Sequence, residues 1–385
     1  MNIVYISPSF PPNYCQFLLG LRNLGVNVFG IGEDCYEDIS NELKYSLTEY
    51  YKVGSMEDYD QLLKAVAFFT HKYGKIDRVF SLNEYWLEKE AMLRTDFNIT
   101  GIKTDTIQTI KCKSKMKEKY IEAGVAVARG EIVHSVEQAR EFIKKVDFPV
   151  VIKPDNGVGA VDTFKINNEK DLGVVFKIKH HGDLIMEEYI DGDLYSFDGL
   201  VDRDGKIVFY TSHYFGTGIM QAVNEKKDLF CYSLREVPAD LREAGEKTLK
   251  VFNAKETFFH LEYFRTKKDN KIVALEVNMR PPGGFVTDMF NFANDINIYQ
   301  EWANVVVNNK FYSKYDRKYH CSFMGRRRGR KYSHSNDEIL SKYGKYIVMD
   351  APMPEVFSGA MGNYVYLARH QDLQKILEIA QFVLE

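Results

Sequence analysis

The chain has 385 residues, which is too long for one small domain, so two or three lobes are expected. Its 54 Asp and Glu against 51 Lys and Arg leave a net charge of −3, which provides no overall field to attract nucleic acid or an anionic membrane. No stretch reaches about 18 apolar residues, and the five cysteines are scattered without a C-x-x-C motif. We therefore expect a cytoplasmic protein with reduced thiols and with neither a membrane nor a nucleic-acid partner.

The N-terminal part alternates between apolar strands and amphipathic helices. Strands are expected at residues 3–7, 26–30 and 78–82, and helices at residues 14–24 and 59–73. This alternation predicts a parallel α/β lobe over about residues 1–110. No G-x-G-x-x-G follows the first strand, which argues against a dinucleotide site. Asn83 and Glu84, after the third strand, are either the edge of an active site or the start of a capped helix.

Two lysines in the middle of the chain stand out. Lys113 lies on a lysine-rich helix expected over residues 111–124, where most lysines only solvate the outer face. Lys153 ends an apolar strand, and an ammonium group there needs an anionic partner. The small residues that follow include Gly157 and Gly159, whose backbone amides can approach a phosphate closely. The alternative is a hairpin turn beside a lysine that extends to solvent.

The strand at residues 273–278 has an unusual polar face. Strict alternation places Ala274, Glu276 and Asn278 on one face and the apolar Val273, Leu275 and Val277 on the other. Arg280 and a Pro-Pro-Gly-Gly turn follow directly. A carboxylate and an amide beside a guanidinium are typical of hard-cation ligands next to a phosphate site.

The strand before it carries a second carboxylate, Glu262. If the hairpin is centred on Asp269, Glu262 lies directly opposite Glu276; a two-residue turn at Asp269–Asn270 would separate them. Two facing carboxylates repel each other, and a divalent cation between them removes that cost. The alternative is a pair of solvated glutamates on an exposed hairpin.

Taken in order, Lys113, Lys153 with its glycine loop, Glu262 and the Glu276-Val-Asn-Met-Arg280 run resemble the ATP-grasp superfamily of carboxylate–amine or carboxylate–thiol ligases. The resemblance covers roughly residues 111–305. It implies an α/β protein, α+β in its nucleotide-binding part, with a mobile lid and a central antiparallel sheet. The expected domains are the N-terminal α/β lobe (1–110), the ATP-grasp domain (111–305, with its lid about 111–185 and its core about 186–305) and a C-terminal appendage (306–385).

The resemblance also implies how the nucleotide is held. Lys113, Lys153, Gly157 and Gly159 would bind the phosphates of ATP. Glu187 would face the adenine amine, while the Glu188 carbonyl and the Ile190 amide bind the base through the backbone. Many relatives have an acid that holds the ribose where this chain has Leu194, so Asp193 is the candidate substitute. Asp198 stands where the family often has an acid lining the site, although it is equally an ordinary polar strand position.

The implied metal ligands are Glu262, Glu276 and Asn278, holding Mg²⁺ or, as a substitute, Mn²⁺. The implied catalytic residues are Arg280 and Lys153. Such a site activates a small carboxylic acid, for instance an amino acid, as an acyl phosphate and joins it to an amine. A homodimer is an option because many relatives pair.

Two other functions stay open. One is a biotin-carboxylase-like enzyme that activates bicarbonate, although the chain has no biotinyl-carrier motif. The other is a catalytically silent ATP-binding module. A basic run at residues 326–331 is either a solvated loop or a set of arginines that holds a substrate anion.

Overall fold

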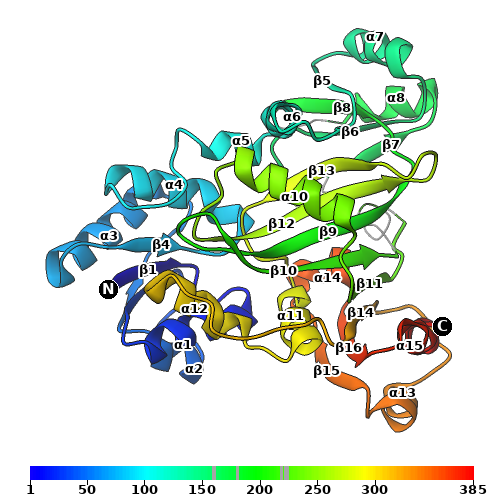
Figure 1. The fold of residues 1–385 in the computed structure, drawn as a ribbon. Helices are drawn as coiled ribbons and strands as arrows, with labels where there is room; N and C mark the ends of the chain where they lie inside the picture. Colours follow the sequence, from blue (N-terminus) through cyan, green and yellow to red (C-terminus); the bar gives the residue numbers. More distant parts are fainter. Residues whose placement is uncertain (158–161, 179–181, 217–219, 221–224) are drawn as a thin grey trace.

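Three β-sheets organise the chain in the computed structural model, which describes residues 1–157, 162–178, 182–216, 220 and 225–385 (Figure 1). The N-terminal sheet is parallel, with the strand order β3-β2-β1-β4. Its strands are β1 (Asn2–Ile6), β2 (Asn27–Gly32), β3 (Glu49–Lys52) and β4 (Arg78–Phe80). The predicted parallel α/β lobe is therefore confirmed.

Helices pack on this sheet because their apolar residues recur at helical spacing. In α3 (Tyr59–Tyr73) the buried residues are Leu62, Ala65, Val66 and Phe69. Asp58 caps the start of α3 by accepting a hydrogen bond from the Asp60 amide, and Gly74, at φ 86°, follows its end. The other helical segments of this lobe are η1 (Pro12–Tyr14), α1 (Cys15–Asn23), α2 (Asn41–Ser46), η2 (Glu84–Trp86) and α4 (Leu87–Asp96).

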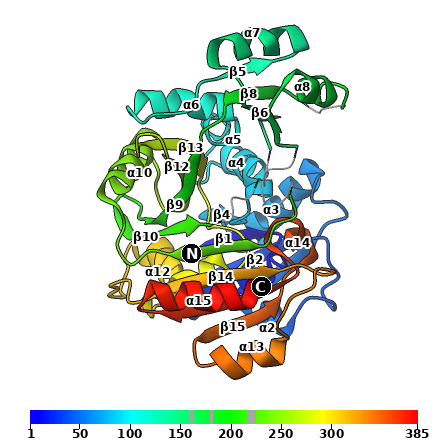
Figure 2. The same cartoon turned by 90° about the vertical axis from the view of Figure 1, so that its right-hand side faces the viewer.

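A small antiparallel sheet, of order β5-β8-β6-β7, stands apart from the other two sheets (Figure 2). Its strands are β5 (Gly130–Val133), β6 (Val150–Pro154), β7 (Phe164–Ile166) and β8 (Leu184–Glu188). Helices α7 (Val136–Val146) and α8 (Glu169–Val175) bury their apolar residues against it. Two further helices, α5 (Ile107–Lys111) and α6 (Lys113–Glu122), precede this sheet. Met116 and Tyr120 of α6 pack into the core of the large sheet.

The third sheet has eight strands in the order β13-β12-β9-β10-β11-β14-β16-β15. They are β9 (Gly192–Val201), β10 (Ile207–Phe215), β11 (Leu229–Ser233), β12 (Thr257–Thr266), β13 (Ile272–Asn278), β14 (His320–Arg326), β15 (Ile347–Pro352) and β16 (Tyr364–His370). Three of these strands come from the expected C-terminal appendage and are hydrogen-bonded into the central sheet through β11 and β14. The domain boundaries themselves stay predictions.

Helices cover both faces of the large sheet. Residues of α6 and α10 (Ala239–Val251) bury one face, while α11 (Val286–Asn294) and α14 (Glu355–Met361) pack on the other. Trp302, in α12 (Ile298–Asn308), packs on Phe17 and Phe80 of the N-terminal lobe, in a core cluster that also contains Phe209 and Phe258 of this sheet. Helices α13 (Asn336–Tyr343) and α15 (Leu373–Leu384) cover β14 and β16. None of the helices in the described ranges is both long and apolar enough to cross a membrane.

The chain enters and leaves the small sheet at two places, and both are bonded to the β12–β13 hairpin. On the way in, the Ala126 carbonyl accepts a hydrogen bond of 2.8 Å from the amide of Ala274 in β13. On the way out, the Asp191 carbonyl accepts one of 2.9 Å from the amide of Lys267, just after β12. The hairpin therefore carries both points of attachment of the small sheet.

Candidate active site

The β12–β13 hairpin places Glu262 directly opposite Glu276. Nearer the turn, Tyr263 pairs with Ala274, so the register there differs by one residue from that of the Glu262–Glu276 pair. Leu275 is the extra residue, and it forms a β-bulge between the two registers. Facing residues of a ladder point to the same side of the sheet. The expected pairing of the two carboxylates is therefore confirmed, and the bulge is what produces it.

The bulge also overturns one expectation about the faces of β13. Ala274 packs in the same apolar cluster as Val277, whereas Leu275 packs against the cluster on the other face of the sheet. Ala274 therefore does not share the face of Glu276 and Asn278, and Leu275 does not share that of Val277. Strict alternation failed here because the extra residue of a bulge shifts the order of side chains by one position.

Glu276 is partly buried beside a second carboxylate. Burial raises the pKa of Glu276, Lys113 offsets part of that effect, and the charge of Glu262 adds to it. The Lys113 Nζ lies 3.5 Å from Glu276 Oε1. Within the described ranges no group of three or more His, Cys, Asp or Glu is arranged to hold a metal, so a site here depends on the Asn278 amide as well. Two carboxylates and an amide offer oxygen donors only, which fits Mg²⁺.

Lys153 is paired with Glu187 in the interior. Its Nζ lies 2.6 Å from Glu187 Oε2, and the Nζ of Lys117 lies 2.6 Å from Oε1. Burial opposes the charge of Glu187, but the two lysines outweigh it and lower its pKa to about 2. Both carboxylate oxygens of Glu187 thus face ammonium groups, and its expected contact with the adenine amine stays a prediction.

Lys117 was missed in the sequence, although a pattern pointed to it. Lys113 and Lys117 are four residues apart on α6 and so lie on the same face of that helix. The Lys117 Nζ also donates to the Ala128 carbonyl at 2.8 Å. The i, i+4 spacing could have separated this lysine from Lys115, which is exposed, and from Lys119, which is partly exposed.

The start of α6 is tied to the end of β6, where the glycine loop begins. Asp155 accepts hydrogen bonds of 2.7 Å from both the amide and the hydroxyl of Ser114. The Lys113 Nζ donates to the Gly157 carbonyl at 3.2 Å, which brings these two predicted phosphate ligands together. Gly159, the other predicted ligand of the loop, lies outside the described residues.

The predicted base-binding linker follows β8. The Glu188 carboxylate forms an ion pair with Arg129, with 2.6 Å between Oε2 and Nη2. The backbone carbonyl of Glu188 is the group expected to bind the base. Ile190 is partly exposed. These two backbone contacts stay predictions.

Asp193 lies at the start of β9, next to Leu194. Leu194 packs on the face of the sheet that Glu262 occupies, because it pairs with Phe264, two residues from Glu262. Asp193 precedes Leu194 and therefore points to the opposite face. The ribose contact of Asp193 stays a prediction.

Arg280 is held from the N-terminal lobe. Its Nη2 lies 2.5 Å from Glu84 Oε2 and donates to Asn278 Oδ1 at 3.1 Å. Burial opposes the charge of Glu84, but Arg280 outweighs it, so the pKa of Glu84 is lowered. Asn83 caps η2 by accepting from the Tyr85 amide at 3.0 Å. The cap by Asn83 is therefore confirmed, whereas the active-site edge at Glu84 stays a prediction.

The basic run serves the fold. Arg326 donates to the Val383 carbonyl at 2.6 Å, which fixes α15, and Arg330 pairs with Asp228 at 3.0 Å. Arg327 donates to the Lys227 carbonyl at 2.9 Å. Arg326, Arg327 and Arg330 are thus bonded within the fold, and a role of the run in holding a substrate anion stays a prediction.

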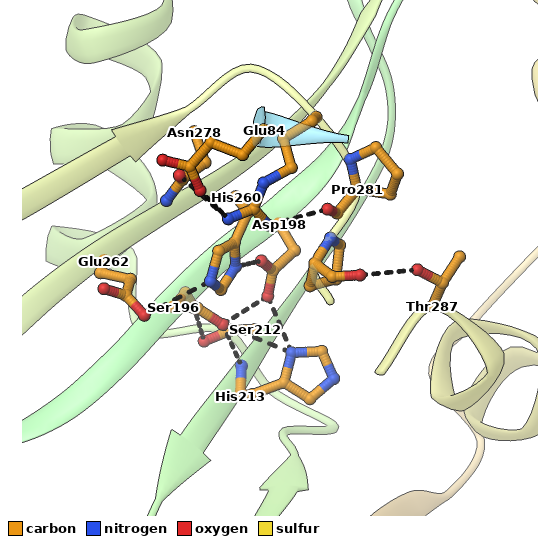
Figure 3. Close-up of polar contacts among 12 residues, drawn as sticks. Glu84, Ser196, Asp198, Ser212, His213, His260, Glu262, Asn278, Pro281 and Thr287 are labelled. Carbon is orange, nitrogen blue, oxygen red and sulfur yellow. Dashed lines mark hydrogen bonds and ion pairs between the residues drawn. The ribbon is translucent and has the colours of Figure 1, made fainter. Parts of the chain in front are cut away.

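A buried polar cluster lies behind Glu262. Asp198 is fully buried and accepts hydrogen bonds from His260, His213 and Ser196 (Figure 3). Burial opposes its charge, but His260 and the other donors outweigh it and lower its pKa below the usual range. Asp198 therefore supports the site from inside the sheet and does not line its surface.

Comparison with known proteins identifies the fold around this site. Residues 146–288 match the model of the ATP-grasp domain family. The chain is 26% identical over 294 residues to the L-arginine-specific L-amino acid ligase of Bacillus subtilis, covering 74% of this chain and 70% of that protein.

Solved structures of related enzymes have the same overall fold as this chain. An L-amino acid ligase from Bacillus licheniformis superposes with a TM-score of 0.77 at 16% identity, covering 99% of this chain and 96% of that one. The biotin carboxylase domain of the 2-oxoglutarate carboxylase of Hydrogenobacter thermophilus, solved with MgADP and bicarbonate, gives 0.72 at 15% identity, covering 99% and 89%. At these identities the structural likeness establishes the fold. The sequence match over residues 146–288 and this likeness make the chain similar to ligases of the ATP-grasp fold.

Proposed function

We propose that the chain is an ATP- and Mg²⁺-dependent ligase that activates a small carboxylic acid as an acyl phosphate and joins it to an amine. The observation that supports this proposal is the facing pair of Glu262 and Glu276, with Lys113 beside it and Arg280 close by. The relative from Bacillus subtilis is named for L-amino acids, so amino acids are the first acids to test. Mn²⁺ is proposed as a substitute cation, and the homodimer stays a proposal.

Each side chain has a task in this reaction. Lys113 and Lys153 neutralise the phosphates of ATP, while Glu262, Glu276 and Asn278 hold the cation. The cation, when bound, screens the charge that builds up on the phosphate oxygens.

Arg280 completes the chemistry. The substrate carboxylate attacks the γ-phosphorus in line, ADP leaves, and the amine then displaces phosphate from the acyl group. The guanidinium of Arg280, kept in place by Glu84 and Asn278, stabilises the oxyanion of that second step.

A hydroxylamine assay tests the proposal. The full chain is incubated with ATP, Mg²⁺, pooled amino acids and hydroxylamine, and hydroxamate and phosphate are measured. Hydroxamate formed in step with phosphate supports the ligase. Phosphate release that requires bicarbonate, without hydroxamate, would replace it by the carboxylase, and ATP binding without either product would leave only a silent module.

Glu276→Gln should lower turnover by more than about 100-fold, because loss of an outer-shell partner alone costs about 10- to 100-fold. The fold should persist, since the amide has the same shape as the carboxylate. Glu246→Gln on the exposed face of α10 is the matched control and should leave turnover unchanged. Near-normal activity of the Glu276→Gln variant would remove Glu276 from the metal site.

A further inference from the structure

The buried carboxylate of Asp198 lies between two imidazoles (Figure 3). His260 Nδ1 is 2.5 Å from Asp198 Oδ1, and His213 Nδ1 is 2.7 Å from Oδ2. Ser196 donates its hydroxyl to Oδ2 as well. Asp198 and His213 are fully buried, and His260 is 8% exposed. The cluster is therefore part of the sheet interior, and His260 is its outermost member.

These contacts fix how each ring is oriented. An ionised carboxylate only accepts hydrogen bonds, so both imidazoles use their Nδ1–H for Asp198, and Nε2 is the nitrogen that remains. In His213 that Nε2 is buried without a hydrogen-bond partner among the described residues, and the ring stacks on Phe290. In His260 the Nε2 lies 3.4 Å from Glu262 Oε1. Of the two rings, His260 is thus the one that connects Asp198 to the acidic pair.

Glu262 needs such a partner because it faces another carboxylate. Glu276 has Lys113 within 3.5 Å, whereas Glu262 has the imidazole of His260. Carboxylates that bind a metal are usually held by further hydrogen bonds, and these partners set the orientation of the ligand. A carboxylate without one would turn away from its like-charged neighbour.

We propose that His260, itself fixed by Asp198, is a positioning residue that orients the Glu262 carboxylate for the divalent cation. The inference rests on the proposed function only in taking Glu262 as a cation ligand. Asp198 acts through the His260 ring and has no direct contact with the cation. His213 holds the far side of Asp198 and has no part in cation binding.

Two substitutions of His260 separate its contacts. In His260→Gln the amide nitrogen reaches about as far as Nε2 and can still donate to Glu262. In His260→Asn the amide corresponds to Nδ1, so the contact with Asp198 remains and the contact with Glu262 is lost. His213→Asn is the matched control, because it alters the same buried cluster on the side away from Glu262.

The measurement is the binding of Mn²⁺ to the full chain with an ATP analogue that cannot be hydrolysed, followed by the electron paramagnetic resonance of free Mn²⁺. His260→Asn should weaken binding by about 10- to 100-fold. His260→Gln should recover most of that loss, and His213→Asn should bind like the unchanged chain. Thermal unfolding is recorded for each variant.

Three outcomes decide the matter. Unchanged Mn²⁺ affinity in a folded His260→Asn variant would overturn the proposal. Equal losses in both His260 variants would overturn it as well, since the contact with Glu262 that His260→Gln keeps would then make no difference. Recovery in His260→Gln supports it, because a general defect in folding would not be rescued by that change. Glu262→Gln and Glu276→Gln are measured in parallel. If both variants bind Mn²⁺ as tightly as the unchanged chain, the cation site of the proposed function fails as well. If both bind Mn²⁺ more weakly while His260→Asn binds it normally, only the role of His260 is refuted.

Discussion

Glu187 illustrates how the site handles buried charge. A carboxylate in the interior is tolerated only with partners, and this one has an ammonium group on each oxygen. One of these lysines comes from β6 and the other from α6. The pair of contacts therefore also joins the helix to the small sheet.

Lys117→Met should lower the free energy of unfolding by about 3 kcal/mol, the lower end of the range for breaking a buried ion pair, because Glu187 keeps Lys153. Lys119→Met on the same helix is the control; its pair with Glu122 is exposed, so we expect a change within about 0.5 kcal/mol. Urea unfolding measures both. Equal free energies of unfolding in the two variants would show that the ion pair of Lys117 with Glu187 adds no stability.

At the level of single residues, chemistry was easier to predict than orientation. Glu262, Glu276 and Arg280 were found because their types and order match one kind of site, and the structure brings them together. Ala274 was assigned to the wrong face of its strand. That assignment required knowing which face the residue occupies, and a bulge reverses that face.

The hairpin of β12 and β13 shows the same limit at the scale of an element. Its two strands and their pairing were predicted from hydrophobic alternation and a turn rich in polar residues. The bulge at Leu275 has no mark in the sequence, because Leu275 is apolar like its neighbours and differs only in the side to which it packs. Likewise, nothing in the composition of residues 306–385 indicated that their strands extend the central sheet.

The strand β9 depends on a glycine at its centre. A Cβ at Gly199 would lie 2.1 Å from the Phe209 carbonyl oxygen of the neighbouring strand and 2.6 Å from Phe259 Cζ. Gly199→Ala should therefore destabilise the protein by at least the 1–3 kcal/mol or so of an overpacked core. Because Asp198 is adjacent, cation binding should weaken too.

Gly173→Ala is the control for this substitution. Gly173 lies in α8, and nothing stands within 4 Å of its added Cβ. Alanine favours a helix over glycine by about 0.5–1 kcal/mol, so we expect a gain in stability. Urea unfolding that ranks the two variants in the reverse order would contradict this view of β9.

At the scale of the whole molecule, Asp288 connects the N-terminal lobe to the large sheet. Its Oδ2 accepts from Asn13 Nδ2 at 3.0 Å, and its Oδ1 accepts from the Tyr299 hydroxyl at 2.7 Å. Burial raises the pKa of Asp288 to about 6, and these hydrogen bonds offset only part of that effect. Because burial outweighs these hydrogen bonds, the folded state as a whole favours the protonated carboxyl.

The pH dependence follows from that direction. The folded state holds the proton more tightly than the unfolded chain, whose Asp titrates near about 3.9, so this contribution is complete below about pH 4 and is lost as the pH rises through about 6. Asp288→Asn removes the titration. The stability of the unchanged chain relative to Asp288→Asn should fall by no more than about 3 kcal/mol between about pH 4 and about pH 7.5. Parallel urea-unfolding curves across that interval would show that Asp288 does not titrate there.

The two attachments of the small sheet restrict how the molecule can move. The carbonyls of Ala126 and Asp191 are bonded to the two strands of a single hairpin, the one that carries Glu262 and Glu276. Helix α6, which packs on the large sheet through Met116 and Tyr120, is bonded to the small sheet as well, through Ser114 and Lys117. A rigid displacement of the small sheet that keeps both hairpin bonds is a rotation about the line through them, and such a rotation must carry α6 along or break its bonds to the small sheet.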